Sequence, residues 1–223
     1  MSAAAAAMLR FWSLSLLERP GRSSGRTPTA IAAAKARTKS LTNVSFQLGD
    51  AAELSFDRQF DAAVGRYVLM FNSDPAAILR GIKRHLKPGG IVVFHEVDWA
   101  TVSSTPAAPL YDHCCKWIVD TFAKVGTDSF MGKKMFSAFQ QAGFPAPTMG
   151  MSALFGGGSN ERNGAGMVAD LAVTMAPVMQ EHGVVSRAEM IPDTLKLRVF
   201  SEIESLGSVV TGRSEVGAWS RRP

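Results

Sequence analysis

The chain has 223 residues, of which 46% are hydrophobic and 19% charged, and its formal net charge is +5 at pH 7. That balance is typical of one globular domain with a small subdomain, and it excludes a disordered or fibrous chain. Seven basic residues and one acidic residue fall within residues 1–40, so the rest is close to neutral and gives no indication of nucleic-acid binding. No apolar run of 18 residues predicts a membrane span.

Residues 1–26 differ from the rest of the chain. They are rich in alanine, arginine and serine and poor in acidic residues. Such a composition fits an organellar transit peptide, and a second reading is that the segment is an out-of-frame translation rather than native coding sequence. We expect residues 1–26 to stand outside the folded domain, which then spans residues 27–223.

Hydrophobic periodicity predicts alternating strands and helices from Thr27 onward. Local signals mark several helix ends, including Asp74-Pro75 at one start and Gly143 at one end. The alternation favours an α/β fold with a mainly parallel sheet, and about residues 105–206 are expected to form a helical insertion in it. The expected helices are 27–37, 74–85, 109–125, 133–142, 165–181 and 187–206, and the expected strands are 44–48, 61–68, 91–94, 148–155 and 215–219.

The cysteines give no indication of a metal site or a disulfide. Cys114 and Cys115 are the two cysteines, and adjacent cysteines rarely form a bridge because the peptide between them is strained. His113 precedes them, but neighbouring positions on a helix do not share a face. The chain therefore suits a reducing compartment, and we expect a cytoplasmic protein without a metal.

Four segments carry a family resemblance, in this order: NVSFQLGDAAELSF (43–56), FDAAVGRYVLMF (60–71), LKPGGIVVFHEVDW (86–99) and EVGAWSRRP (215–223). They resemble the third, fourth, fifth and last strand regions of class I S-adenosylmethionine-dependent methyltransferases, within the small-molecule group that includes quinone-ring methyltransferases. The resemblance implies a Rossmann-like sheet flanked by helices. It also implies that the first strand, its Gly-rich loop and most of the second strand are missing.

The resemblance further implies a strand order of 3-2-1-4-5-7-6. The third strand, at 44–48, then has no neighbour unless it moves beside the fourth or the N-terminal segment substitutes for the missing strands. Buried backbone groups without partners cost on the order of 1–3 kcal/mol each. We therefore expect a marginally stable chain or one that depends on a partner.

Site residues follow from the same resemblance. Asp50 would accept a hydrogen bond from the adenine amino group of S-adenosylmethionine, and the Ala51 backbone would support the ring edge. Arg66 and Tyr67 would border the methionine end of this cofactor. The catalytic residue is not identified: His95, Glu96 and Asp98 follow the fifth strand, at the carboxyl edge where open α/β sheets bind ligands. The alternative for each of the three residues is a role in capping a helix or a place on the surface.

The predicted function is S-adenosylmethionine-dependent methyl transfer to a small-molecule acceptor. Because the sequence lacks the family's acidic-Gly-x-Gly-x-Gly loop, whose N–H groups approach the cofactor, we expect this chain to be impaired. The alternative is a non-catalytic fragment or pseudo-enzyme that acts through a binding partner. The sequence predicts neither the acceptor, nor O-, N- or C-methylation, nor the oligomeric state.

Overall fold

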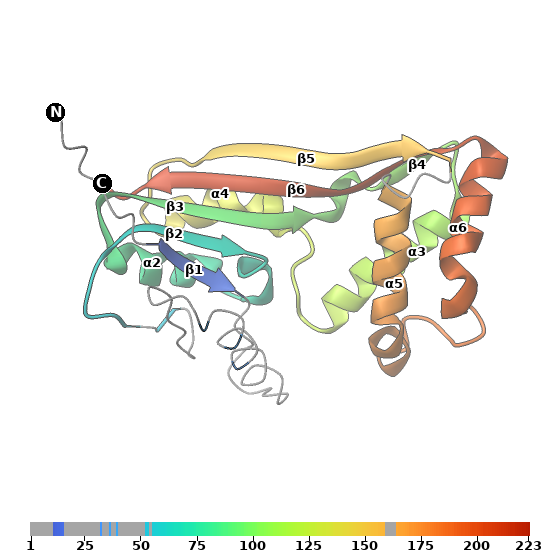
Figure 1. Cartoon of the computed structure of the whole chain (residues 1–223), viewed down its shortest axis with the longest axis horizontal. Helices are drawn as coiled ribbons and strands as arrows, with labels where there is room; N and C mark the ends of the chain where they lie inside the picture. The colour runs from blue at the N-terminus through green and yellow to red at the C-terminus, as the bar shows by residue number, and fades with distance from the viewer. Residues whose placement is uncertain are drawn as a thin grey trace. The chain divides into compact units, whose positions relative to one another are not determined.

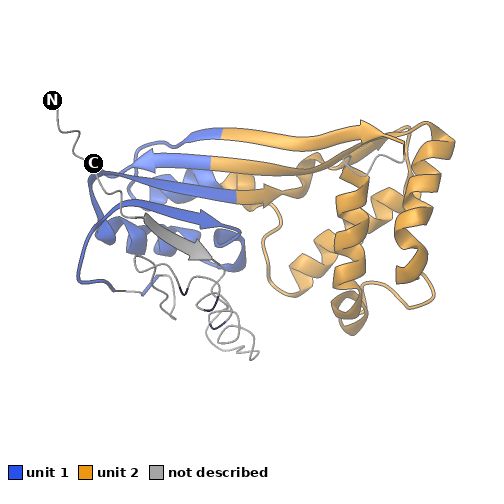
Figure 2. Ribbon diagram, in the orientation of Figure 1, with its two compact units in different colours: residues 1–95, 135–149, 218–223 blue, residues 96–134, 150–217 orange. Residues whose placement is uncertain are grey.

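The structure is a computed structural model that describes residues 55–158 and 164–223, the backbone of 11–15, and positions 32, 36, 39, 52 and 53. The chain divides into two compact units (Figure 2). Unit 1 comprises residues 1–95, 135–149 and 218–223, and unit 2 comprises residues 96–134 and 150–217. The expected strand at 44–48, together with Asp50 and Ala51, lies outside the described residues.

A six-stranded sheet has the order β1-β2-β3-β6-β4, with β5 pairing β6. The first three strands pair in parallel, whereas β4 and β6 are antiparallel. Figure 1 shows that β6 also runs in the opposite direction to β3 and β5. The sheet is thus mixed where the sequence predicts a mainly parallel one. The strands are β1 (Phe11–Ser15), β2 (Phe60–Arg66), β3 (Leu86–Asp98), β4 (Ser103–Thr105), β5 (Thr148–Gly157) and β6 (Val209–Arg221).

The strand β1 lies in the segment for which the sequence predicts no strand. Its backbone pairs with β2 in register, from Phe11 opposite Ala62 to Ser15 opposite Arg66. Part of the N-terminal segment therefore supplies the neighbour that β2 needs on that side. Further along the chain, Ala32 and Ala36 are helical, and both lie within the helix expected at 27–37.

In unit 1, helix α2 (Pro75–His85) begins and ends where its sequence predicts. The Asp74 side chain caps it by accepting a hydrogen bond from the Ala77 N–H at 2.9 Å, and Ile78 and Ile82 are buried. The first residues of β3 are joined to the last residues of the chain: the Gly89 N–H donates to the Arg222 carbonyl at 2.9 Å. This pairing extends β3 back to Leu86, earlier than the predicted start at Ile91.

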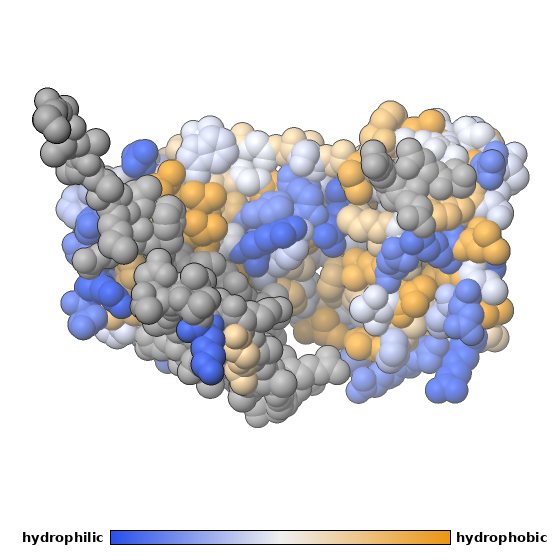
Figure 3. Space-filling view, viewed as in Figure 1, coloured by the Kyte–Doolittle hydropathy of each residue, from blue (hydrophilic) through white to orange (hydrophobic). Residues whose placement is uncertain are grey.

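In unit 2, α3 (Pro109–Lys124) packs on α5 (Gly164–Glu181) and α6 (Pro192–Leu206). Glu202 of α6 accepts hydrogen bonds from the N–H groups of Leu110 at 2.9 Å and Tyr111 at 3.3 Å, so it caps the start of α3. Over these helices, hydrophobic residues reach the surface among hydrophilic ones (Figure 3). Helix α6 begins at Pro192, five residues after the predicted start.

Helix α4 (Met131–Gln141) ends at Gln141, and Gly143 follows it with a φ of 76°, as its sequence predicts. Two short 3-10 helices, η1 (Leu69–Phe71) and η2 (Trp99–Thr101), follow the ends of β2 and β3. Among the helices of the described residues, none combines the length and apolar character needed to cross a bilayer.

Candidate functional site

The carboxyl ends of β2 and β3 bring three of the predicted site residues together in unit 1. The two strands are parallel, and Arg66 pairs with His95 in their register. Tyr67 follows directly, and its N–H donates to the His95 carbonyl at 2.9 Å. This edge is where open α/β sheets hold their ligands. The structure therefore places Arg66, Tyr67 and His95 at one strand edge.

Tyr67 has a backbone conformation that L-residues rarely adopt. Its φ is 52°, in the left-handed region, where a bulky side chain is a genuine outlier. Such a residue costs about 1–3 kcal/mol, and outliers of this kind cluster at ligand sites. The hydrogen bond to the His95 carbonyl holds the conformation. The Tyr67 ring lies beside the imidazole, with 5.5 Å between ring centroids and 35° between planes.

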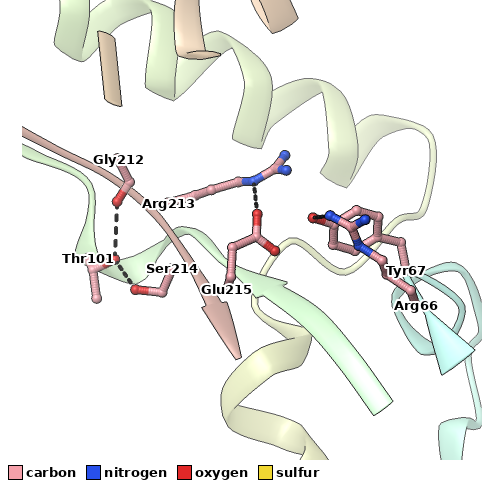
Figure 4. A network of polar contacts seen from close by, with 7 residues as sticks. All are labelled: Arg66, Tyr67, Thr101, Gly212, Arg213, Ser214 and Glu215. Atoms are coloured by element: carbon pink, nitrogen blue, oxygen red, sulfur yellow. Dashed lines mark hydrogen bonds and ion pairs between the residues drawn. The ribbon is translucent and has the colours of Figure 1, made fainter. Parts of the chain in front are cut away.

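Arg66 folds back over the tyrosine (Figure 4). The carbon at the centre of its guanidinium lies 4.7 Å from the Tyr67 ring centroid, and its Nη2 donates to the phenolic oxygen at 3.1 Å. Arg66 is exposed and Tyr67 is half-buried. Together they present a positive charge and a phenol at the end of β2.

Gly65 leaves room for the ring of Phe94 just before this edge. A Cβ at this position would lie 2.2 Å from Cε1 of Phe94, the residue opposite it in β3. Phe94 is fully buried and meets Phe139 edge to face, with 6.5 Å between centroids. A side chain at Gly65 would therefore force the core apart next to Arg66.

The two predicted carboxylates, Glu96 and Asp98, are both buried in unit 2. Asp98 uses each oxygen structurally: Oδ1 accepts from the Ala100 N–H at 3.0 Å and Oδ2 accepts from the Lys133 N–H at 3.0 Å. It thereby ties the start of η2 to the first turn of α4. Glu96 is fully buried, whereas the preceding His95 is half-buried, as alternation along a strand predicts.

A polar cluster that the sequence analysis misses lies on the same unit, along β6. The Arg213 Nε donates to Glu215 Oε1 at 2.9 Å, and the Thr101 and Ser214 hydroxyl oxygens are 2.7 Å apart (Figure 4). The Arg213 guanidinium lies 6.0 Å from the ring centroid of Trp99, whose buried Nε1 has no hydrogen-bond partner within the described residues. The sequence could have indicated the pair of Arg213 and Glu215, since positions two apart on a strand share a face.

The cysteines are unsuited to nucleophilic chemistry. Cys114 and Cys115 form no disulfide and are buried, and that burial raises the pKa of each thiol to about 12. Burial likewise raises the pKa of the neighbouring Tyr111, whose hydroxyl donates to the Thr211 carbonyl at 2.9 Å. In the described part of the chain, no three His, Cys, Asp or Glu side chains gather as metal ligands would.

Comparison with known proteins finds methyltransferases that are similar to part of this chain. Residues 25–94 match the family described as a methyltransferase domain. The demethylmenaquinone methyltransferase of Staphylococcus saprophyticus is 31% identical over 118 residues, which cover 51% of this chain and 47% of that protein. The malonyl-(acyl-carrier protein) O-methyltransferase of Haemophilus ducreyi is 38% identical over 68 residues, 30% of this chain and 26% of that protein.

Among solved structures, a candidate methyltransferase of Bacillus halodurans has a TM-score of 0.52 at 15% identity, over 88% of this chain and 80% of that one. That likeness is one of fold. The chain spans about half the length of the Staphylococcus relative, and the matched part of the Haemophilus relative is shorter still.

Proposed function

We propose that this chain is a class I S-adenosylmethionine-dependent methyltransferase, which binds S-adenosylmethionine at the carboxyl ends of β2 and β3 and methylates a small molecule. The observation that supports this site best is the left-handed backbone of Tyr67, held by the His95 carbonyl at the end of β2. Strain of this kind persists where a ligand site requires a particular backbone path.

The residues at this edge fit one end of the cofactor. The Arg66 guanidinium is exposed and positively charged, which suits the methionine carboxylate, and the Tyr67 ring borders the same position. Asp50 and Ala51 would hold the adenine, as the family resemblance implies. When bound, S-adenosylmethionine supplies an electrophilic methyl group. The protein then has to align the acceptor with that group and to exclude water.

Proton removal from the acceptor is assigned to His95 in this proposal. Both oxygens of Asp98 already accept backbone hydrogen bonds, so a proton on that carboxylate would disrupt the start of α4. A neutral imidazole has a ring nitrogen that can accept a proton, as a general base must. A base is needed where the acceptor atom carries a weakly acidic proton.

The lack of the Gly-rich loop sets the expected strength of binding. In the family, that loop directs backbone N–H groups and a helix N-terminus at the cofactor. This sequence has no such pattern before residue 50, so we propose weaker cofactor binding than in the relatives. The alternative function is a non-catalytic one, in which the chain acts by binding a partner. The unbridged thiols favour a reducing compartment, and the cytoplasm is the proposed location.

Calorimetric titration of S-adenosylhomocysteine into the purified chain tests the proposal. We expect measurable binding that Asp50→Ala abolishes and Arg66→Gln weakens. Asp57→Ala is the matched control, since Asp57 is an exposed aspartate outside the proposed site. A folded sample that takes up no ligand would contradict the proposal and leave the non-catalytic function. Binding that survives Asp50→Ala would contradict the adenine assignment.

A further inference from the structure

Strand β5 forms an unusual sheet edge. Among the described strands it pairs with β6 alone, so within the described part of the chain no strand pairs with its other side. The strand is 10 residues long, and it contains neither a charged residue nor a proline. Almost all of it is exposed, including Met151 at 64%, Leu154 at 45% and Phe155 at 73%.

Edges of this kind are rarely left open. Proteins protect sheet edges with short strands, bulges, prolines or charged side chains, because an open edge pairs with any other strand. Strands are most often 5–6 residues long, roughly half the length of β5. Without charge or proline, β5 lacks the usual protection. Its exposed apolar side chains, Met151 and Phe155, lie on one face because they are four positions apart.

The pattern along β5 fits a second copy of the same strand. Odd-numbered positions are apolar and even-numbered positions are mostly small or polar. In an antiparallel pair around a two-fold axis at Ser152, each residue faces one of the same parity, so Met149 meets Phe155 and Met151 meets Ala153. No like charges meet, because the strand has none. The odd-numbered residues are Met149, Met151, Ala153, Phe155 and Gly157, and the even-numbered ones are Thr148, Gly150, Ser152, Leu154 and Gly156.

We propose that the protein forms a two-fold dimer in which β5 pairs antiparallel with β5 of a second copy, centred on Ser152. The two sheets then continue into one another, and the backbone groups at both edges gain partners. A two-fold interface requires a surface that is complementary to itself, and the uncharged alternation of β5 meets that requirement. This inference is independent of methyl transfer.

Sedimentation velocity of the full chain and of a Met151→Lys/Phe155→Lys variant tests the dimer. Both side chains are exposed, so the variant should fold, and circular dichroism checks that it does. The two lysines would bring like charges together across the axis, and we expect a monomer. Leu197→Lys is the control, because Leu197 is 69% exposed on α6 and outside β5; this variant should remain dimeric.

A cross-link tests the register. With the axis at Ser152, the two copies of that residue face each other at a Cα separation of about 4.5–5.5 Å, which a disulfide spans. Cys114 and Cys115 are buried, so the thiol of Ser152→Cys is the reactive one. We expect a covalent dimer on oxidation, and none for Ser205→Cys on α6. A monomeric wild type, a dimer that survives both lysines, or no cross-link at position 152 would each overturn the proposal.

Discussion

Gly65→Ala is predicted to destabilise the protein because the added methyl group would overlap the ring of Phe94. The added Cβ would lie 2.2, 2.6 and 2.7 Å from three carbons of the Phe94 ring. That ring has little freedom to move, since it is fully buried and packs against Phe139. Overpacking a core costs about 1–3 kcal/mol. The alanine lowers the entropy of the unfolded chain, which offsets about 0.4–1 kcal/mol. We expect a net loss of about 1–2 kcal/mol.

Urea unfolding measures this loss. With a slope of about 2 kcal/mol/M, the midpoint should fall by about 0.5–1 M. Gly217→Ala is the control, because Gly217 also lies in a strand and a Cβ there would meet nothing within 4 Å. Combining Gly65→Ala with Phe94→Leu makes room for the methyl group. The double-mutant cycle should therefore show a favourable interaction of about 0.5–3 kcal/mol. Equal midpoints for Gly65→Ala and Gly217→Ala, or purely additive losses in the cycle, would refute the reasoning.

Three further predictions concern unit 2. Asp98→Ala should lower the free energy of unfolding by about 3 kcal/mol, since hydrogen bonds to charged groups contribute about 1.5–3 kcal/mol each; Asp98→Asn should lose less, and urea midpoints compare the two. Glu202→Ala removes the cap of α3 and should cost about 1 kcal/mol, whereas the exposed Glu204→Ala on the same helix should cost much less by the same measurement. Cys114 and Cys115 should resist a thiol reagent at neutral pH until the protein unfolds. Because burial raises their pKa from 9.0 to about 12, their neutral forms stabilise the fold below pH 9.0, and that contribution is lost as the pH rises towards about 12. Rapid modification of the native protein would contradict this.

Elements with local signals were predictable from sequence. Helix α2 has its cap and proline at Asp74-Pro75, and α4 is followed by Gly143. The predicted start of α6 was too early. Pro192 marks the observed start, because proline is tolerated in the first turn of a helix and not in its interior. Strand β1 was missed, since its pairing partner β2 lies about 50 residues further along the chain and no local pattern reports such a pairing.

The family resemblance predicts that Arg66 and Tyr67 border the cofactor, and that role stays a prediction. Their geometry was not predictable from sequence, because the left-handed φ of Tyr67 runs against the preference of any residue with a bulky side chain. Asp98 makes one hydrogen bond that its local sequence predicts and one that it does not. Its hydrogen bond to the Ala100 N–H is a local turn that aspartate favours. Its bond to the Lys133 N–H depends on the tertiary fold, and it is this second bond that commits both oxygens to structure.

These contacts indicate which residues matter most for the proposed reaction. Transfer of a methyl group from a sulfonium depends on alignment more than on proton chemistry. The end of β2 supplies alignment through its backbone: Gly65 allows the close approach to Phe94, and the hydrogen bond from the Tyr67 N–H to the His95 carbonyl fixes the turn that follows. A change that moves this backbone shifts Arg66 and the Tyr67 ring together, whereas loss of the His95 imidazole removes one proton acceptor. Gly65 and Tyr67 should therefore tolerate substitution less well than His95 does.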